Sequence, residues 1–168
     1  MRLLALALAA TLAACVPVQN QPGPVSPAAP ATTQPAPDGA ALYRQSCAGC
    51  HQDTGAGIEG VFPPLARHVP AILKAEGGRG YLARVLLFGL QGPIRAQGKN
   101  YNGRMPAFSA LEDAQIAALL NHLSRSWGNA ELLPGFRSYT LDEVAALRAD
   151  RLTMTRMLEL RGSLSPQP

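Results

Sequence analysis

The stretch CAGCH, residues 47–51, places two thiols and an imidazole next to one another in the chain. Four kinds of site hold two cysteines at this spacing: a disulfide, a zinc site, a redox-active dithiol and a covalent haem attachment. Each makes different demands on the rest of the sequence. The remaining residues therefore decide what these two cysteines do.

Other candidate ligands and the local context favour haem attachment. A structural zinc site needs four protein ligands, and outside the motif only His68 and His122 offer an imidazole, neither with a neighbouring cysteine. A thioredoxin-like dithiol is expected between a strand and a helix, and the sequence around the motif predicts no strand. A disulfide between Cys47 and Cys50 would leave His51 without a role. We therefore predict one haem c, attached covalently through Cys47 and Cys50.

The spacing of the motif suits this chemistry. The two thiols add to the two vinyl groups along one edge of a haem, and a helical turn from Cys47 to Cys50 brings both under that edge. His51 follows directly, so its imidazole can approach the iron. Covalent attachment also prevents loss of the haem in an open compartment.

The first 15 residues, MRLLALALAATLAAC, combine Arg2 with a short apolar run. That run is shorter than the roughly 20 residues of a membrane-spanning helix, and the small residues at its end are typical of a secretory signal. Its end, LAAC, resembles the bacterial lipobox, in which the cysteine is lipidated and becomes the mature N-terminus. The alternative is an ordinary signal peptide cut nearby. We predict a lipoprotein signal over residues 1–14 and lipidation of Cys15, giving an exported protein anchored to a membrane and facing the periplasm or the outer surface.

Residues 15–37 are rich in Pro, Ala and Gln, and they carry no charge. Such a segment does not form a packed core, and its prolines favour the extended polyproline II conformation. At about 3.1 Å per residue, it would reach roughly 70 Å when fully extended. We interpret it as a tether between the lipidated cysteine and the folded part.

Apolar periodicity predicts several short helices after the tether. Asp38 is placed to cap a helix that ends at the motif, and residues 81–90 repeat apolar side chains at helical spacing. Ser109 and Glu112 match a capping box at the start of an amphipathic helix that stops near residue 128. Thr140 and Glu143 repeat that pattern for one or two further helices.

Glycine and proline separate these helices. Residues 55–68 and residues 91–108 are rich in both and are predicted to be long loops. No stretch shows a strand-like alternation of useful length. The predicted fold class is therefore all-α, with short helices and long loops.

Residues 38–128 resemble class I cytochromes c, especially the small bacterial monohaem domains. The resemblance rests on LYRQSCAGCH, FPPLA, YLARVLLFGLQGPI, YNGRMPAF and IAALLNHL, which occur in the order found in that family. It implies a cytochrome c fold wrapped around one covalently bound haem, with a C-terminal helix packed across the N-terminal one. Residues 129–168 extend past the usual end of the family, either as a partner interface or as packing on the same domain.

The resemblance also implies the axial ligands of the haem iron. His51 corresponds to the proximal ligand and Met105 to the distal one, and Pro63 matches the proline whose carbonyl accepts the Nδ1 proton of the proximal histidine. Met105 lies in a polar, glycine-rich segment where a methionine has little core to fill. Met154 and Met157 lie on a predicted helix beyond the family's usual end and are expected to pack in the core.

Ligation by His and Met leaves the iron no open position, which favours outer-sphere electron transfer over catalysis. We therefore expect a non-enzymatic, membrane-tethered carrier of single electrons between redox proteins. The family implies a periplasmic dehydrogenase as donor and a terminal oxidase or reductase as acceptor. The net charge of +4 is scattered and forms no basic block, so no nucleic-acid partner is expected.

Two other functions stay open. The first is a haem subunit held permanently in a dehydrogenase or oxidase complex, with residues 129–168 as a possible interface. The second is a haem sensor or peroxidase in which Met105 leaves the iron so that an external ligand can bind.

Overall fold

In the computed structural model, which describes residues 35–168, Asp38 begins the first helix, α1 (Gly39–Ser46). Its carboxylate accepts hydrogen bonds from the main-chain N–H groups of Ala40 and Ala41, at 2.9 and 3.2 Å. Two of the N–H groups that have no partner within the helix are thereby satisfied. The predicted cap at Asp38 is confirmed. The predictions for residues 1–14 and Cys15, and most of the predicted tether over residues 15–37, fall outside the described residues.

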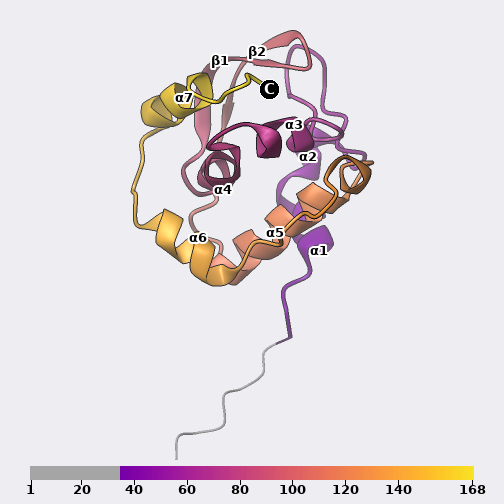
Figure 1. Ribbon diagram of the computed structural model, residues 1–168, viewed down its shortest axis with the longest axis vertical. Helices are drawn as coiled ribbons and strands as arrows, with labels where there is room; N and C mark the ends of the chain where they lie inside the picture. The colour runs from indigo at the N-terminus through magenta and orange to yellow at the C-terminus, as the bar shows by residue number, and fades with distance from the viewer. Residues whose placement is uncertain (1–34) are drawn as a thin grey trace, which may run out of the picture. The chain divides into compact units, whose positions relative to one another are not determined.

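Helices are the main regular elements of the described chain (Figure 1). After α1 they are α2 (Ala48–His51), α3 (Val69–Lys74), α4 (Gly78–Phe88), α5 (Asp113–Arg125), a short 3₁₀ helix η1 (Ala130–Leu132), α6 (Leu141–Arg148) and α7 (Met154–Gly162). Helix α1 packs across α5, as the resemblance implied. Gly39 makes this crossing possible, because a Cβ at that position would overlap the main-chain oxygen of Ala118 in α5.

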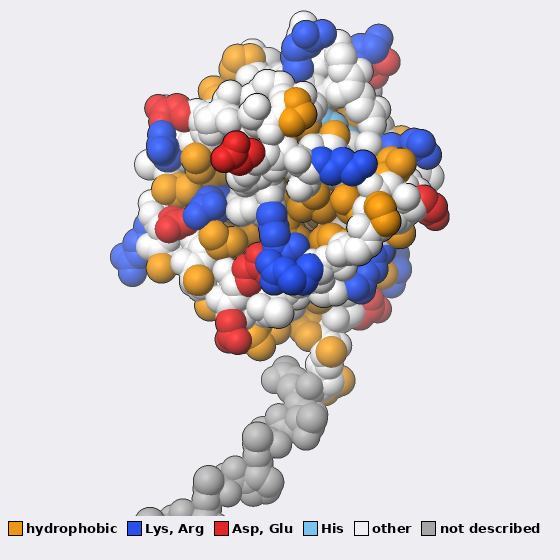
Figure 2. All heavy atoms as spheres, in the orientation of Figure 1, with side chains coloured by type: hydrophobic (Ala, Val, Ile, Leu, Met, Phe, Trp, Pro, Cys, Tyr) orange, Lys and Arg blue, Asp and Glu red, His pale blue; other side chains and the backbone are white. Residues whose placement is uncertain are grey.

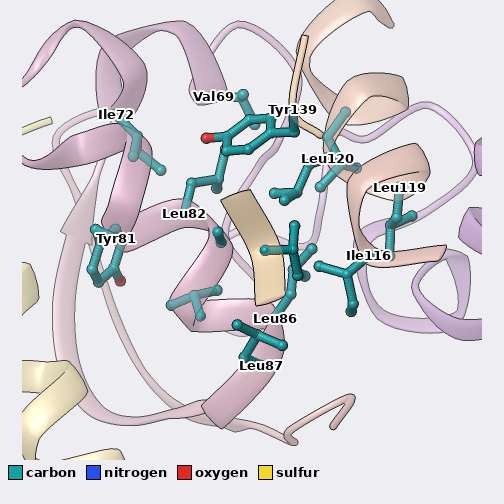
Figure 3. Packing of buried hydrophobic residues seen from close by; sticks show 14 of the residues in the cluster. Val69, Ile72, Tyr81, Leu82, Leu86, Leu87, Ile116, Leu119, Leu120 and Tyr139 are labelled. Carbon is teal, nitrogen blue, oxygen red and sulfur yellow. The ribbon is translucent and has the colours of Figure 1, made fainter. Parts of the chain in front are cut away.

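The core lies mainly between α4 and α5. Figure 3 shows the leucines of α4 facing apolar side chains of α5, with the ring of Tyr139 at the same interface. The side chains at this interface include Leu82, Leu86, Leu87, Ile116, Leu119 and Leu120, all buried. Within residues 35–168, no helix is both long enough and apolar enough to cross a membrane.

The all-α prediction is wrong in one element. Residues predicted as a loop form an antiparallel pair of strands, β1 (Leu90–Ala96) and β2 (Lys99–Met105). The two residues between the strands, Gln97 and Gly98, both have positive φ, 47° and 78°. This is the backbone that tight hairpin turns prefer. Pro93 is tolerated because each strand of a two-stranded sheet has a free edge that needs no N–H donor.

The start of α5 also differs from the prediction. The capping box does not join Ser109 and Glu112; Glu112 is itself the N-cap, and its partner is Gln115. The Gln115 side chain accepts from the main-chain N–H of Glu112 at 2.9 Å. The main-chain oxygens of Ser109 and Leu111 instead accept from the Arg148 guanidinium, at 2.8 and 2.7 Å, so this segment remains outside the helix.

Of the capping box predicted at α6, only one of the two hydrogen bonds forms. The Thr140 hydroxyl accepts from the main-chain N–H of Glu143 at 3.2 Å, which is the expected cap. The Glu143 carboxylate does not return to Thr140. It forms a two-point ion pair with Arg79 of α4, with both N–O distances 2.6 Å.

Residues 129–168 pack on the rest of the described unit. Helix α6 lies against α4 and α5, and α7 lies along β1 and α4 (Figure 1). Val144 and Met157 are fully buried at these contacts, so Met157 packs in the core as predicted. Of the two roles considered for this extension, the structure shows packing on the same domain.

Candidate haem site

The CAGCH motif is itself a helical turn that continues from α1. The main-chain N–H groups of Cys50 and His51 both donate to the oxygen of Cys47, at 3.1 and 2.9 Å. Residues three apart on a helix share a face, so the turn brings the thiols of Cys47 and Cys50 to one side. The two thiols are not joined to each other, and Cys47 is buried whereas Cys50 is exposed. Burial raises the pKa of Cys47 to about 11, opposite to the lowered pKa of a redox-active dithiol.

His51 is 7% exposed and is oriented by one contact. Its Nδ1 lies 2.9 Å from the main-chain oxygen of Pro63, which is the contact that the resemblance implied. With Nδ1 as donor to this oxygen, Nε2 is left as the atom able to bind a metal. Burial lowers the pKa of His51, while the Pro63 hydrogen bond acts in the opposite direction. At neutral pH the imidazole is therefore in its neutral, ligating form.

A tight loop holds Pro63 in place. The main-chain oxygen of Gly55 accepts from the N–H groups of Leu65 and Ala66, at 2.7 and 2.9 Å. Gly57 has φ +67°, and a Cβ there would overlap the oxygens of Phe62 and Pro63. The glycine therefore allows the loop to bring the Pro63 oxygen under the imidazole.

Two connected cavities extend from the motif into the molecule. The outer one has an empty volume of about 720 Å³ and the inner one about 630 Å³, and in both the volume includes space open to solvent. They share six lining residues: Cys47, His51, Pro63, Leu90, Ile94 and Met105. The thiol of Cys47, the imidazole and the thioether thus meet at one mainly apolar space.

Met105 is the last residue of β2 and pairs in register with Leu90, the first residue of β1. The residue before Leu90 is Gly89, whose φ is +74° and whose missing Cβ would crowd the main-chain oxygen of Met105 at 2.6 Å. This close approach holds the main chain of Met105 against the turn that ends α4. Among residues 35–168, Met105 is the only methionine that lines either cavity.

The other two histidines lie in different surroundings. His122 contacts the rings of Tyr43 and Trp127, with centroids 5.5 and 5.4 Å away, and is outside both cavities. His68 is buried and lines the inner cavity. Burial, helped by the charge of Arg161, lowers the pKa of His68 to about 4, so this imidazole is neutral.

The donor set fits a covalently bound haem. Two thiols at one edge, an imidazole with a free Nε2, a thioether and apolar walls are the groups that a c-type haem uses. They do not fit a zinc centre, because nowhere in residues 35–168 do three His, Cys, Asp or Glu side chains gather to hold a metal ion.

Sequence reasoning missed part of the cavity wall. Every second residue of β1, from Leu90 through Gly92 and Ile94 to Ala96, is buried or half-buried. This period of two was present in the sequence and could have identified the strand. Tyr81 and Arg161 also line the inner cavity. No local pattern marks Arg161, because it lies in the extension, far along the chain from the motif.

Known proteins resemble this chain over the same region. Residues 34–123 match the family model described as cytochrome C oxidase, cbb3-type, subunit III. The chain is 54% identical to cytochrome c-552 of Thermus thermophilus over 127 residues, covering 76% of this chain and 96% of that protein.

More distant matches are to subunits of larger proteins. The chain is 34% identical over 92 residues to the cytochrome c subunit of an alcohol dehydrogenase (quinone) from Gluconobacter oxydans, covering 54% of this chain and 18% of that protein. It is 33% identical over 118 residues to a gluconate 2-dehydrogenase cytochrome c subunit from Pantoea cypripedii, covering 67% and 24%. The family match spans the motif, the hairpin and nearly all of α5, so the chain belongs to the c-type cytochromes, as a monohaem electron-transfer domain whose haem c is bound covalently through cysteines.

Proposed function

We propose that this cytochrome is a lipid-tethered carrier of single electrons, in which His51 and Met105 bind the two faces of the haem iron. The observation that carries the proposal is that the imidazole and the thioether line one apolar cavity, with Cys47 and Cys50 at its edge. When bound there, the haem supplies a centre that accepts and releases one electron. Two protein ligands leave no position for a substrate, which favours transfer between proteins over catalysis.

The chain's own residues set the conditions for that transfer. The Pro63 oxygen holds the His51 ring and makes it more basic. The thioether of Met105 favours the reduced state and raises the reduction potential. Apolar side chains such as Leu90 and Ile94 exclude water from the cavity. Val61 and Cys50 line this cavity and are both exposed, which offers a partner an apolar approach.

The proposed lipid anchor is supported by the N-terminal sequence, and the proposed partners are supported by the relatives. The apolar run ending at Cys15 and the uncharged segment after it support an exported protein tethered by lipid. The names of the dehydrogenase subunits support a dehydrogenase as electron donor. An oxidase or reductase is the proposed acceptor. On the face drawn in Figure 2, basic and acidic side chains are interspersed, which supports protein partners over nucleic acid.

A permanent place in a larger complex is the second candidate. It is favoured by relatives that are cytochrome subunits of dehydrogenases, in which the matching segment is 18% to 24% of the whole protein. Extraction of native membranes with a mild detergent, followed by size separation, distinguishes the two. A carrier elutes at the size of the single chain, whereas a subunit elutes with a dehydrogenase.

The test of the carrier function is reaction with carbon monoxide. The oxidised protein, with its haem attached, is expected to take up one electron per haem, and the reduced protein is expected to bind no carbon monoxide at neutral pH. Rapid formation of a carbon monoxide complex by the unmodified protein would show an open or easily opened iron. That result would replace the carrier with the sensor or peroxidase alternative.

A further inference from the structure

Arg161 is a buried arginine at the wall of the inner cavity. It lies in the last turn of α7 and is 4% exposed. It is the only Lys, Arg, Asp or Glu among residues 35–168 that is buried. A buried guanidinium is rare without partners, because removing its charge from water carries a large free-energy penalty.

The hydrogen-bond partners of Arg161 satisfy only one of the two terminal nitrogens of its guanidinium. Nη2 donates to the main-chain oxygens of Arg95 and Pro168, at 2.6 and 3.0 Å. Nη1 is buried and has no hydrogen-bond partner within the described chain, the only buried side-chain nitrogen or oxygen there in that condition. None of the ion pairs between described residues includes Arg161. A buried N–H donor without a partner indicates that its acceptor belongs to a group outside the described chain.

The cavity indicates where that acceptor lies. Arg161 lines the inner cavity together with Tyr81 and His68, and the same cavity reaches Cys47, His51 and Met105. The guanidinium carbon lies 5.8 Å from the centre of the Tyr81 ring. The charged group therefore borders the space in which the haem is held, away from the protein surface.

The chemistry of haem provides a matching group. A haem carries vinyl groups on one half of the ring and two propionate carboxylates on the other. If the vinyl half is attached at Cys47 and Cys50, the propionates belong to the half away from the cysteines. A carboxylate is the acceptor that a guanidinium binds most strongly, with both charge and geometry matched.

We propose that Nη1 of Arg161 donates a hydrogen bond to a haem propionate, so that the C-terminal extension supplies the counter-charge buried beside the cofactor. The inference rests on the haem being held as proposed above. Arg161 then has two roles on two nitrogens: Nη2 attaches α7 to β1, and Nη1 binds the cofactor. His68 and Tyr81 are the neutral side chains that accompany this pair.

The direct test is a crystal structure of the haem-loaded wild-type protein. We expect Nη1 of Arg161 within hydrogen-bond distance of one propionate oxygen. A structure in which both propionates are remote from Nη1 would overturn the inference. The same structure would report separately on His51 and Met105, so the proposed carrier could stand while the role of Arg161 failed.

A second test compares Arg161→Met with Arg156→Met, a matched change on the same helix. Arg156 is exposed and pairs with Glu159 at 2.7 Å, so its loss removes one charge without reaching the cavity. The readout is an NMR pH titration of isotope-labelled propionate carboxyl carbons. The other titratable side chains that line this cavity are Tyr81 and His68, together with Cys47 and His51 of the motif, which are the same in all three proteins.

We expect one propionate to remain ionised to the lowest pH in the wild type and in Arg156→Met, and to titrate at a clearly higher pH in Arg161→Met. Equal propionate titrations in all three proteins would refute the contact. If Arg161→Met does not mature, Arg161→Lys serves instead, because lysine keeps the positive charge but lacks the paired N–H donors of the guanidinium. We expect Arg161→Lys to shift the titration in the same direction by a smaller amount.

Discussion

The main-chain N–H of Arg67 donates to Oδ1 of Asn129 at 2.6 Å, which joins the end of the Pro63 loop to the segment after α5. Asn129 is fully buried, and its Nδ2 also donates to the oxygens of Leu65 and Leu123, at 3.2 and 2.7 Å. One amide side chain therefore joins the loop that orients His51 to the helix that packs on α1.

We predict that Asn129→Ala lowers the free energy of unfolding by about 2–4 kcal/mol, because three main-chain groups, one buried and two partly buried, lose their partner. The measurement is chemical denaturation of the haem-loaded protein. Asn121→Ala is the control, since Asn121 makes two similar bonds to Tyr139, remote from the loop. Asn129→Ala should also alter the haem absorption spectrum, and Asn121→Ala should not. A loss below about 0.5 kcal/mol for Asn129→Ala would contradict this account.

The loop glycines allow a sharper test of the His51–Pro63 contact. Gly57 and Gly60 both have positive φ, +67° and +75°, but only a Cβ at Gly57 would meet the oxygens of Phe62 and Pro63. Both alanine substitutions should destabilise by about 1 kcal/mol through backbone strain. Gly57→Ala should also displace the Pro63 oxygen, make His51 less basic and raise the reduction potential. Identical potentials for the two variants would count against the role of Pro63.

The proposed axial role of Met105 predicts a loss of the long-wavelength band of His/Met ferric haem in Met105→Ala. The reduction potential should fall, because the thioether favours the ferrous state, and the reduced variant should bind carbon monoxide. Met154→Ala is the control, since Met154 lies against the Gly89 turn and does not line the cavity. Retention of the band in Met105→Ala would require another sixth ligand.

The ion pair of Arg79 with Glu143 predicts a pH-dependent stability. Arg79 lowers the pKa of Glu143 below its usual 4.5. A carboxylate with a depressed folded-state pKa contributes stability above its unfolded pKa and loses it as the pH falls through the folded value. Glu143→Gln should therefore be about 1 kcal/mol less stable at pH 7, with the difference vanishing in acid. A difference that persists unchanged under acid conditions would show that charge is not its cause.

The proposed anchor predicts that Cys15→Ser releases the protein from membranes without changing its haem spectrum. Residues 16–37 carry no charge and are not expected to contribute to the fold. The measurement is partition between membrane and soluble fractions, with the haem absorbance of each. Cys15→Ser protein that remains in the membrane fraction through high-salt washing would disprove the lipid anchor.

Local signals in the sequence identified the parts of the site that a single segment builds. The CAGCH turn and the cap at Asp38 depend on neighbours in the chain, so spacing alone was sufficient to predict them. The hairpin was missed because its glycines and Pro93 were interpreted as signs of a loop, while the alternation of β1 was overlooked. At α5, Glu112 was placed at the wrong position of a capping box, since the same spacing also fits Gln115.

Contacts between distant segments could not be predicted in this way. Arg161 reaches the cavity only because α7 packs along β1 and α4. The packing of Tyr139, Val144 and Met157 likewise depends on the surface that α4 presents. Buried residues that are scattered along the chain show no periodicity that identifies the surface on which they pack. The sequence therefore left open whether residues 129–168 pack on the same domain or form an interface with another protein.

The pairing of Met105 with Leu90 has a consequence for the speed of electron exchange. An electron moves fastest when the atoms around the iron shift little between the oxidised and reduced forms. Here the residue that carries the thioether is the end of a hydrogen-bonded strand, set against the Gly89 turn. Such a backbone resists displacement more strongly than an unpaired loop does. If Met105 binds the iron as proposed, a low reorganisation energy, and hence rapid exchange at small driving force, would follow from the hairpin itself.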